Sequence, residues 1–591
     1  MFAWTKEELD AAQEAAIREE HSVFLVACPG SGKTRTLTYK IAHELSKLKS
    51  RKQRVLAITY TNKAANEIQE RIEKMGLNID QLWIGTIHSF CLDWIIKPYG
   101  IYHEHLKYGY RVINSHDSET ILTDICVNYP TPKITYYNCG HFYESTGLRI
   151  DCTDYRQTNV QSVLRDYHAL LRLNRQIDFE QILWYSYELI IQQPEISKLL
   201  SKIFSYVLID EYQDTKEIQY QILGSIIKKG EGCVKVFVVG DPNQAIFTSL
   251  GGYAIAIEEL SELMEIEFTP MALHANYRST QKIVNYFSNF KVYDSEIESY
   301  AKHKSYPSLI SFNRQISRHN LINEISRLIK LNIEDYGISP NEICVVGPWW
   351  IHLASLTRGL VAALPEYSFD GPGLTPFSRD VENFWYKLAR LVLTKPSPSS
   401  YLRRLRWSKE IIVSLSDAGV DTSNYSTKGF LRNINQIKVE EQDGLTYLKV
   451  FFDEFFRKLG IIYSDFYVLL EHHDAFFQSS QERIDRIIRD GFEYAGEVET
   501  FHRAFESRKG VTISSIHSIK GTEFDTVIAF AMLEDIVPHF SDPSPRDSAK
   551  KLLYVIGSRA RKNLHLISEQ GRNQANPTKE LLALKYDYDA E

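Results

Sequence analysis

The chain has 591 residues, of which 44% are hydrophobic and 24% are charged, so folded structure is expected almost throughout. At about 150 residues per domain, this length corresponds to about four domains or subdomains, each large enough to have its own core. The net charge of −7 excludes a uniformly basic nucleic-acid binder, so any binding of nucleic acid must come from local patterning.

The N-terminal segment MFAWTKEELDAAQEAAIREEH has the pattern of a charged amphipathic helix and lacks the apolar centre of a signal peptide. No later run approaches the roughly 18 apolar residues that a membrane-spanning helix needs, so we expect a cytoplasmic protein that does not enter a membrane. The seven cysteines form no CxxC pair. This argues against a zinc finger or an iron–sulfur cluster and favours reduced thiols.

A first set of predicted strands runs through the N-terminal half of the chain. SVFLVACPGSGKTRTLTYKIAHEL passes from an apolar strand through a Gly/Pro turn into a helix. RVLAITYT, LWIGTIHSF, YVLIDEYQD and CVKVFVVGD then supply further apolar runs, each ending in polar residues. This pattern is typical of buried parallel strands whose C-terminal ends carry a site.

A second set follows, made of EICVVGP, VTISSIHSIKG, DTVIAFAML and NLHLIS. Each set is interrupted by mainly helical sequence, from Cys91 to Asp178 and from about Tyr401 to Lys509, and TKPSPSS (394–400) is the clearest linker. The predicted fold class is therefore α/β, with two parallel-sheet cores that each contain a mainly helical insertion.

ACPGSGKT matches the phosphate-binding loop of nucleoside triphosphatases, with Ala27 in place of the first glycine. The residues expected to line the phosphates are Ala27, Cys28, Pro29, Gly30, Ser31, Gly32, Lys33 and Thr34. Lys33 would reach the β and γ phosphates, and Thr34 would hold Mg²⁺. The alternative is a chance Gly-rich turn. The loop alone indicates only nucleotide binding, since kinases, GTPases, transporters and motors share it.

VLIDEYQDT narrows the class to hydrolases. An apolar strand that ends in Asp210 and Glu211 offers one carboxylate to hold Mg²⁺ and a second to orient or deprotonate the attacking water. Kinases do not need the second carboxylate. The alternative is a charged turn after a buried strand.

Seven ordered segments extend the match along nearly the whole chain, from about Leu9 to about Ile567. They are ITYTNKAANEIQERI (58–72), GTIHSF (85–90), IDFEQIL (177–183), DEYQDT (210–215), HANYRSTQKIV (274–284), IHSIKGTEFDTVI (516–528) and YVIGSRARKNL (554–564). In order and spacing the chain resembles UvrD/Rep/PcrA-type superfamily 1A DNA helicases. The resemblance implies two RecA-like P-loop cores. It divides the chain into a first core (1–98 and 179–275) with insertion 99–178, and a second core (276–400 and 510–591) with a reduced insertion 401–509.

The resemblance also implies the nucleotide contacts. Gln13 would recognise adenine, and Tyr277 would stack on the base with Arg35 beside it. Glu523 would accept a hydrogen bond from the ribose hydroxyl. Arg278 and Arg559 would be arginine fingers at the γ phosphate, the alternative for each being a surface ion pair. Gln244, at the end of the strand in VFVVGDPNQAIFTSLGG, would face the γ phosphate and report whether ATP or ADP is bound. Its alternative is a turn amide that caps a helix.

For DNA, the resemblance implies polar backbone contacts and aromatic stacking. The polar contacts would be Thr61, Asn62, His88 and His517, and the stacking residues would be Tyr60 and Phe247, whose alternative is a place in the core. The run YLRRLRW (401–407) mixes arginines with aromatics, but we interpret it as an amphipathic, solvated helix.

The chain departs from the family pattern in three places. Ser249 and Leu250 stand where relatives commonly have a Trp-Arg pair, which removes one stacking platform. SAKKLLYVIGSRA (548–560) keeps the arginine but alters its surroundings. The chain stops about 30 residues after Arg559, so we expect no fused nuclease.

The resemblance implies an ATP- and Mg²⁺-dependent translocase or helicase acting on single-stranded or tailed duplex DNA, with 3′ to 5′ polarity. A second hypothesis is an ATP-gated, DNA-sensing regulatory subunit that unwinds poorly alone and signals to a partner nuclease. The compact insertion and the lost stacking residue motivate it, and a short protein of this kind resembles the helicase-like subunit of Gabija antiviral systems, which works with an OLD-family nuclease. Strand displacement by the protein alone would favour the first hypothesis.

Overall fold

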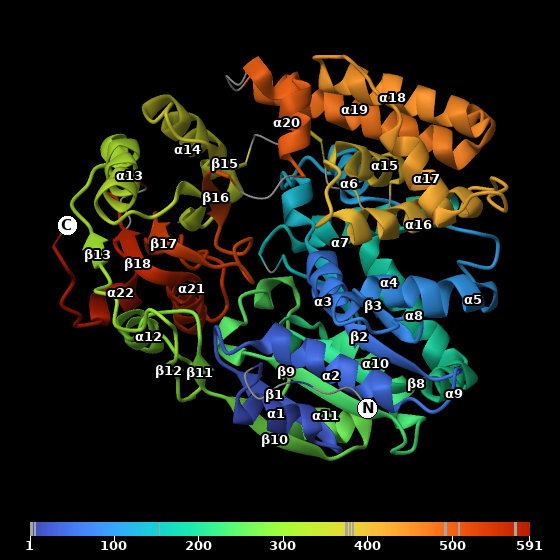
Figure 1. The fold of residues 1–591 in the computed structure, drawn as a ribbon, viewed down its shortest axis with the longest axis horizontal. Coiled ribbons are helices and arrows are strands. Elements are labelled where there is room, and N and C mark those ends of the chain that lie inside the picture. The colour runs from blue at the N-terminus through green and yellow to red at the C-terminus, as the bar shows by residue number, and fades with distance from the viewer. Residues whose placement is uncertain are drawn as a thin grey trace. The chain divides into compact units, whose positions relative to one another are not determined.

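The computed structural model describes residues 4, 8–152, 154–372, 376–377, 380, 383–489, 493–505, 509–572 and 576–590. The chain forms two compact units, each with its own large sheet (Figure 1). The first unit comprises residues 1–308, 538–562 and 580–584, and the second comprises 309–537, 563–579 and 585–591. Within the described ranges, no helix combines the length and the apolar character needed to span a membrane.

The sheet of the first unit has six strands, all parallel, in the order β10-β1-β9-β8-β2-β3. The strands are β1 (Ser22–Ala27), β2 (Arg54–Ile58), β3 (Leu82–Gly85), β8 (Phe204–Asp210), β9 (Lys235–Gly240) and β10 (Phe268–Leu273). All five strands predicted for this half thus form one sheet, which confirms the predicted parallel core. Edge strand β10 was not predicted.

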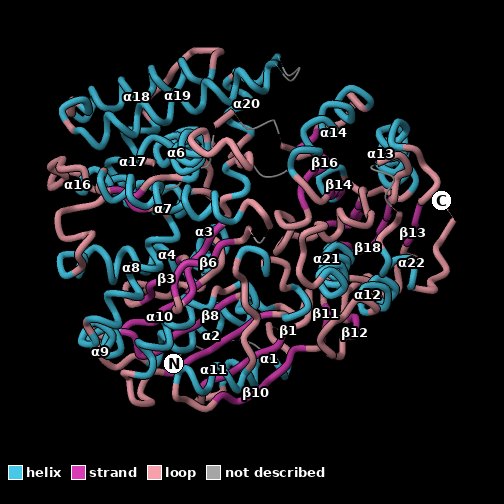
Figure 2. The backbone as a smooth tube through the Cα atoms, turned by 180° about the vertical axis from the view of Figure 1, so that it is seen from behind, coloured by secondary structure: helices cyan, strands magenta, loops and turns pink. Residues whose placement is uncertain are grey.

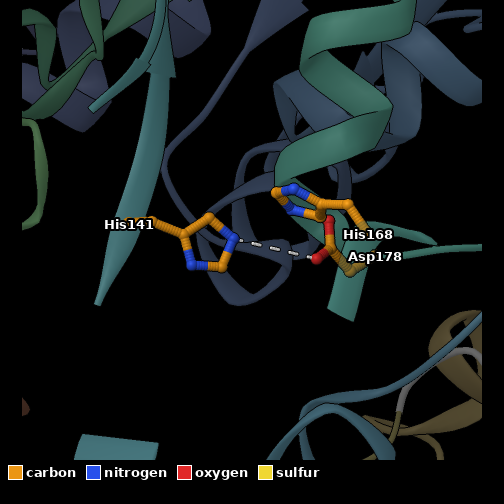
Figure 3. A group of neighbouring side chains, drawn as sticks. All are labelled: His141, His168 and Asp178. Carbon is orange, nitrogen blue, oxygen red and sulfur yellow. Dashed lines mark ion pairs between the residues drawn. The ribbon is translucent and has the colours of Figure 1, made fainter. Parts of the chain in front are cut away.

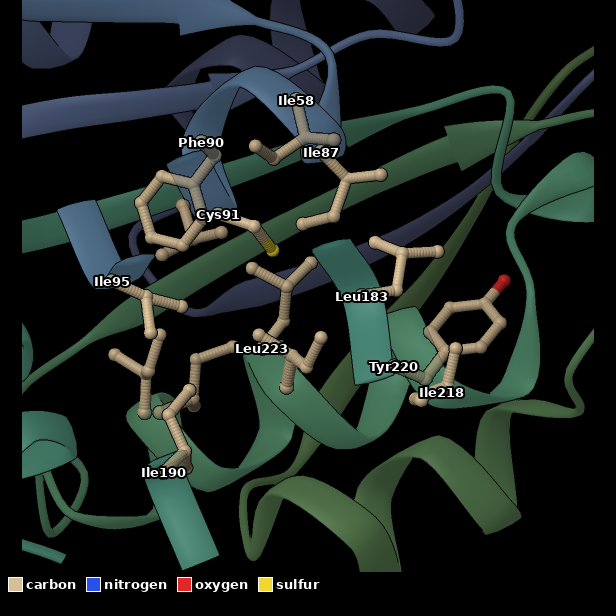
Figure 4. Packing of buried hydrophobic residues seen from close by; sticks show 14 of the residues in the cluster. Ile58, Ile87, Phe90, Cys91, Ile95, Leu183, Ile190, Ile218, Tyr220 and Leu223 are labelled. Carbon is tan, nitrogen blue, oxygen red and sulfur yellow. The ribbon is translucent and has the colours of Figure 1, made fainter. Parts of the chain in front are cut away.

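Both faces of this sheet are buried, which explains the nearly continuous apolar runs of its strands. Val23 and Leu25 of β1 face one hydrophobic cluster, and Phe24 between them faces the other. Helices α1, α2 and α3 cover the first face, and α4, α8, α10 and α11 cover the second. Figure 4 shows the second cluster, where Phe90 and Ile95 pack near Leu183 and Leu223.

The helices of the first unit outside its insertion follow the strands in regular alternation. They are α1 (Ala11–Arg18), α2 (Lys33–Lys47), α3 (Asn62–Lys74), α4 (Ile87–Cys91), α5 (Lys97–Tyr99), α8 (Phe179–Gln192), α9 (Pro194–Ile203), α10 (Glu217–Lys228), α11 (Ile257–Met264), α12 (Gln281–Ser288) and α21 (Pro545–Arg559). A short parallel pair joins β11 (Ala275–Asn276) to β12 (Glu298–Ser299). The alternation of strand and helix is what a parallel sheet requires.

The first insertion combines two helices with two small sheets around its own hydrophobic cluster. Its elements are α6 (Ser115–Cys126), α7 (Gln157–Leu173), the parallel pair of β4 (Arg111–Val112) with β7 (Gln176–Ile177), and the antiparallel hairpin of β5 (His141–Glu144) with β6 (Gly147–Ile150). The hairpin turns at Gly147, whose φ of 120° favours glycine. The sequence pattern predicted the helices but not this hairpin.

The second unit is built on another six-stranded sheet, in the order β13-β18-β17-β14-β16-β15. Its strands are β13 (Ile310–Asn313), β14 (Ile343–Gly347), β15 (Phe369–Asp370), β16 (Val511–Ser515), β17 (Phe524–Ala529) and β18 (Ala560–Ile567), the last beginning in the first unit. The pairings β13–β18, β14–β16, β14–β17 and β15–β16 are all parallel. All four strands predicted for this core are present, and the fold is that of two RecA-like parallel-sheet cores.

The helices of the second unit fall into two groups. Helices α13 (Leu321–Lys330) and α14 (Trp350–Ala363) lie beside the sheet, and α15 (Phe384–Leu393) packs with the helices of the second insertion. Helix α22 (Lys579–Ala583), near the C-terminus, belongs almost wholly to the first unit. The second insertion contains α16 (Tyr401–Asp417), α17 (Thr427–Asn435), α18 (Gly444–Leu459), α19 (Tyr467–Arg489) and α20 (Val498–Arg503) (Figure 2). These helices share an aromatic-rich hydrophobic cluster. The predicted linker 394–400 is a turn between α15 and α16.

The arginine-rich run 401–407 begins α16, as the amphipathic interpretation predicted. Not all of its basic residues are solvated, however. Arg404 is buried and donates to the carbonyl of Leu391 at 3.4 Å, and Arg390 of α15 lies 4.4 Å from the ring centre of Trp407. These contacts join α16 to α15 and give part of the run a packing role.

Candidate nucleotide-binding and hydrolysis site

The carboxyl edge of the first sheet gathers the residues that the sequence singled out. Four neighbouring strands, β1, β9, β8 and β2, lead respectively into the glycine-rich loop, the Gln244 segment, the Asp210–Glu211 pair and the Tyr60 segment. Because parallel strands end at the same edge, segments far apart in the sequence meet there. A ligand that bound at this edge would contact all four.

The glycine-rich loop after β1 has the backbone that its sequence predicts. Gly30 and Gly32 have φ values of 71° and 79°, a region that disfavours side chains. A Cβ atom on Gly30 would lie 2.6 Å from the Cβ of Arg278, and one on Gly32 would lie 2.7 Å from Nε2 of Gln13. Lys33 and Thr34 then form the first turn of α2, whose N–H groups have no acceptor within the helix. The loop and helix start thus form a potential anion site.

Protein donors hold the carbonyl groups of this loop. The carbonyl of Pro29 accepts from Nδ2 of Asn276 at 2.6 Å, and the carbonyl of Gly30 accepts from the N–H of Tyr277 at 2.9 Å. The carbonyl of Ser31 accepts from Nε2 of Gln13 at 2.9 Å. With its carbonyls fixed from outside, the loop can present its N–H groups to a bound anion.

The start of the loop is apolar and chemically inert. Ala27 is fully buried as the last residue of β1, so its replacement of the usual glycine is accommodated inside the sheet. Cys28 is also buried, and burial raises the pKa of its thiol to about 12. It is therefore protonated and unreactive at neutral pH.

Lys33 faces the pair of carboxylates that ends β8. Its Nζ lies 3.3 Å from Oε1 of Glu211. Burial alone would lower the pKa of Lys33, but the negative charges of Glu211, Asp241 and Asp210 outweigh burial and raise it. The ammonium group is therefore charged and available to bind a phosphate.

Asp210 and Glu211 differ in environment. Asp210 ends β8 in a buried position, and burial together with the charge of Glu211 raises the pKa of Asp210 to about 7. Glu211 is more exposed and has a φ of 52°, a strained value for a residue with a side chain. Nε2 of Gln213 donates to Oε2 of Glu211 at 2.5 Å and fixes the carboxylate. A cation near Asp210 would favour its ionised form.

A buried relay follows β9. Nε2 of Gln244 donates to Oδ2 of Asp241 at 2.7 Å, and Oε1 of Gln244 accepts from Nη2 of Arg559 at 2.6 Å. The hydroxyl of Tyr554 lies 3.3 Å from the same Asp241 oxygen. The amide of Gln244 thus uses both its donor and its acceptor to connect a carboxylate at the strand end to the predicted arginine finger.

The second predicted finger, Arg278, lies against the loop. Its Cβ is the atom that a side chain on Gly30 would meet, and its N–H donates to Oδ1 of Asn276 at 2.9 Å. Its Nη1 donates to the carbonyl of Ser558, the neighbour of Arg559, at 2.9 Å. The structure therefore brings both predicted arginines to the glycine-rich loop and its relay.

The residues expected to bind the base lie on the other side of the loop. Oε1 of Gln13 accepts from the N–H of Asp10 at 3.1 Å, which with the bond to Ser31 leaves one amide hydrogen and one lone pair for a ligand. The hydroxyl of Tyr277 donates to Oδ2 of Asp10 at 2.7 Å, and its side chain is 44% exposed. Arg35 is exposed in the first turn of α2. This open aromatic face can accept a base.

Four of the predicted DNA-contacting residues follow β2 and β3, and a fifth follows β9. The rings of Tyr60 and Phe247 lie 5.1 Å apart and are inclined by 33°, with Tyr60 43% exposed. Thr61 caps α3 by accepting from the N–H of Ala64, and Asn62 is exposed beside it. His88 packs 5.8 Å from the ring of Phe179, and burial lowers its pKa to about 4, so it is neutral at pH 7.

The sequence also singled out His517, Glu523 and Ser249. His517 lies in the turn after β16, and Glu523 lies just before β17, both in the second unit. The side chain of Ser249 falls outside what the structure describes, while its neighbour Leu250, at the end of the short helix Thr248–Leu250, is 58% exposed. The sites proposed for these residues stay predictions.

Sequence reasoning missed four residues that hold the site together, namely Gln213, Asp241, Asn276 and Tyr554. Oε1 of Gln213 accepts from the N–H of Asp241 at 3.0 Å, so one glutamine connects the ends of β8 and β9. A signal was present for Asp241, since it ends an apolar strand just as Asp210 does. The other three lie inside segments that carry the resemblance, but the sequence alone assigned them no role.

Comparison with known proteins gives the same family along the chain. The family model described as the UvrD/REP helicase N-terminal domain matches residues 9–265, and that of the UvrD-like helicase C-terminal domain matches residues 463–571. The chain is 28% identical over 291 residues to the ATP-dependent DNA helicase PcrA of Staphylococcus aureus, covering 46% of this chain and 38% of that protein. It is 27% identical over 288 residues to PcrA of Bacillus subtilis, with the same coverage.

A longer match extends from one end of the chain to the other. A probable DNA helicase II homolog of Rickettsia conorii is 25% identical over 629 aligned positions, covering 95% of this chain and 92% of the relative. The match to the PcrA proteins spans only 38% of their length. With two matched family domains on two RecA-like cores, the chain belongs to the UvrD/Rep family of superfamily 1A helicases.

Proposed function

We propose that the chain is an ATP-dependent motor on single-stranded DNA, a translocase or helicase with 3′ to 5′ polarity. The observation that carries this proposal is the arrangement around the loop after β1. Lys33 faces Glu211 at 3.3 Å, and a single glutamine, Gln244, connects the strand end at Asp241 to Arg559. This set of groups suits hydrolysis of a bound nucleoside triphosphate better than binding without hydrolysis.

In this proposal, the loop N–H groups and Lys33 bind the phosphates of ATP. Glu211, held by Gln213, accepts a proton from the water whose oxygen attacks the γ phosphorus, while the bond to the β-γ bridging oxygen breaks and ADP leaves. Arg559 and Arg278 stabilise the charge that develops on the γ phosphate. The residues also fit Mg²⁺, which Thr34 and Asp210 would hold and which would neutralise charge on the phosphates.

Coupling to DNA would run through the segment after β9. Gln244 ends the short helix Pro242–Gln244, and Phe247 follows three residues later with its ring against Tyr60. A change in the Gln244–Arg559 bond on hydrolysis would therefore shift the backbone that carries Phe247. Aromatic rings of this kind stack on bases of single-stranded nucleic acid without regard to sequence.

The direct test is steady-state ATP hydrolysis with and without an oligo-dT single strand. We expect strong stimulation by DNA in the unaltered protein and loss of about 10² to 10⁴ in kcat for Glu211→Gln. Glu258→Gln is the matched control, because Glu258 is exposed on α11, away from the loop. Equal turnover with and without DNA, or normal turnover in Glu211→Gln, would overturn the proposal.

Polarity and unwinding need a separate measurement. Duplexes with a single-stranded tail on either the 3′ or the 5′ side, with a fluorophore on the displaced strand, report both. A 3′ to 5′ motor displaces the strand only from the duplex with the 3′ tail. Displacement from the 5′-tailed duplex alone would contradict the proposed direction.

A second candidate function is an ATP-gated DNA sensor that acts with a nuclease, of the OLD-family type found in Gabija antiviral systems. The observation that favours it is Leu250, a 58% exposed apolar residue where relatives commonly carry the arginine of a Trp-Arg pair. In this case ATP turnover would still respond to DNA, but strand displacement by the protein alone would be weak. Efficient displacement without any partner would exclude this candidate.

A further inference from the structure

A second group of ligand-type side chains lies in the first insertion, away from the glycine-rich loop. His141 comes from β5, His168 from α7, and Asp178 is the N-terminal cap of α8. One ligand atom from each residue lies within 4.8 Å of the others, and Nε2 of His141 is 4.0 Å from Oδ2 of Asp178. Figure 3 shows the three side chains facing one another, with the dashed line joining His141 to Asp178.

The orientation of His141 is fixed by its other ring nitrogen. Nδ1 of His141 lies 2.9 Å from the carbonyl oxygen of Cys139, which can only accept, so Nδ1 carries the hydrogen. Nε2 then has a lone pair directed at the cluster. A backbone carbonyl that holds the distal N–H of a histidine is the usual outer partner of a metal-binding imidazole.

Asp178 is held in a comparable way. Its Oδ1 accepts from the N–H of Gln181 at 2.8 Å, as part of the cap of α8. Its Oδ2, the oxygen nearest His141, accepts from the hydroxyl of Tyr167 at 2.9 Å and retains a second lone pair. Two hydrogen bonds therefore fix a carboxylate whose free lone pair remains available to a cation.

The two imidazoles each keep a buried nitrogen without a hydrogen-bond partner in the part of the chain that the structure describes. These atoms are Nε2 of His141 and Nε2 of His168. His168 is 9% exposed, and the side chains of His141 and Asp178 are 9% and 8% exposed. A buried polar atom left without a partner destabilises the folded state, so a cluster with two such atoms favours a bound ligand.

We propose that His141, His168 and Asp178 bind a divalent transition-metal ion, with Zn²⁺ as the ion that this ligand set suits best. Two imidazole nitrogens and one carboxylate oxygen are standard zinc ligands at about 2.0 to 2.2 Å, with water as the fourth ligand. Tetrahedral bonds of that length place ligand atoms about 3.3 to 3.6 Å apart. The three side chains therefore have to move inward by about 1 Å or less.

The ion would fasten the insertion to the helix that leads back into the first core. The β5–β6 hairpin, α7 and the N-cap residue of α8 would each supply one ligand. Phe179, next to Asp178, packs against His88, which is one of the predicted DNA contacts. The metal would thus fix the base of the insertion beside the proposed DNA surface, and it needs no part of the nucleotide site.

The test is zinc binding by the full chain after treatment with a chelator and gel filtration. Competition with a chromophoric chelator should show one Zn²⁺ bound per chain, and added Zn²⁺ should raise the temperature of thermal unfolding. Replacement by Co²⁺ should give the visible absorption of a tetrahedral site without thiolate charge-transfer bands, which separates this site from binding at the cysteines.

Two variants and a matched control make the result specific. His141→Gln and Asp178→Asn should each weaken Zn²⁺ binding about tenfold or more, while Asp178→Asn keeps the helix cap, since asparagine caps as well as aspartate. His105→Ala removes an exposed histidine of the same insertion and should leave the affinity unchanged. Unaltered affinity in both ligand variants, or no saturable binding by the unaltered chain, would overturn the proposal.

Discussion

The buried polar groups beside the two parallel sheets differ in charge and in how fully they are hydrogen-bonded. At the edge of the first sheet, the carboxylates of Asp210 and Asp241 are buried, and burial raises the pKa of each. In the second unit, Asn332 occupies a buried position beside the sheet and makes four hydrogen bonds to neutral groups. It donates to Leu328 and His565 and accepts from Thr526 and Asn563.

This difference separates a site from a structural network. Asn332 has two donors and two acceptor positions, and all four are used, so nothing remains for a ligand. The carboxyl edge of the first sheet instead keeps the ionisable side chains of Asp210 and Asp241 buried, which is unfavourable for their charged forms. A bound cation and phosphates would relieve this cost. Glu211 at this edge also has a φ of 52°, a strained value for a residue with a side chain.

The largest expected effect comes from breaking the relay at the first edge. Arg559→Ala should lower kcat for ATP hydrolysis about 10³- to 10⁵-fold, because an arginine finger acts on charge that develops only in the transition state. Binding of a fluorescent ATP analogue should change far less. Turnover and analogue affinity, measured on the same preparation, check both expectations.

The controls for this change lie on the same helix. Arg546→Ala removes an exposed arginine at the start of α21 and should leave turnover unchanged. Because Arg559 is buried, Arg559→Lys keeps the charge and tests whether folding rather than catalysis is affected. If Arg559→Ala hydrolyses ATP at an undiminished rate, the bond between Arg559 and Gln244 has only a structural role. The edge of the first sheet would then not differ in function from the network around Asn332.

The second unit should respond in stability and not in catalysis. Asn332→Ala leaves the groups of Thr526, Asn563 and His565 without their partner, so we expect a loss of about 3 kcal/mol in the local stability of that sheet. Hydrogen exchange of the β17 and β18 amides measures the loss. Asn424→Ala, at an exposed position of the same unit, is the control. Unchanged protection in Asn332→Ala would show that the network contributes little.

The sequence predicted the first edge well because its signals are local. A strand followed by glycines and a lysine, or by two acidic residues, is a compact pattern, and both elements formed where the pattern placed them. Edge strand β10 was missed because FTPMAL contains Pro270 and no regular alternation, and proline is tolerated only at such an edge. The β5–β6 hairpin was missed because its ten residues lie inside a stretch with helical pattern on both sides.

The partners within the site could not be predicted in the same way. Gln244 and Arg559 are 315 positions apart, and Asn276 and Pro29 are 247 apart. Only the fold brings such pairs together, and no local pattern states which atoms will meet. The resemblance to known helicases implied a role for each residue, whereas the bond between Gln244 and Arg559 emerged from the packing of α21 against the loop after β9.

A smaller effect should appear in the pH dependence of the nucleotide-free protein. The pKa of Asp210 is raised from 3.8 to about 7 by burial first and by Glu211 second, so the folded protein holds a proton there that the unfolded chain releases. Stability from this group is present below about pH 4 and is lost as pH rises to about 7. Asp210→Asn should therefore raise the stability of the first unit more at pH 8 than at pH 5, with a difference of about 2 to 3 kcal/mol.

Thermal unfolding of Asp210→Asn and of the unaltered protein at both pH values measures this effect. The same variant should hydrolyse ATP poorly, because asparagine cannot supply the negative charge that a bound cation needs. A gain in stability together with a loss of activity is the expected sign of a site that is unfavourable until occupied. If Asp210→Asn and the unaltered protein were equally stable at pH 8, groups within the protein would already compensate the buried carboxylate of Asp210, as the hydrogen bonds of Asn332 do for its amide.

The smallest expected effect concerns the aromatic pair at the end of β2 and β9. Tyr60→Ala should weaken binding of an oligo-dT single strand by about 1 to 2 kcal/mol, the contribution of one base stacked on an aromatic ring. Tyr60→Phe keeps the ring and should bind normally, since stacking does not use the hydroxyl. Fluorescence anisotropy at constant salt measures the affinity, because phosphate contacts vary steeply with ionic strength. If Tyr60→Ala and Tyr60→Phe bind alike, the 5.1 Å contact of Tyr60 with Phe247 is only local packing, and the first edge would be a nucleotide site without a track for DNA beside it.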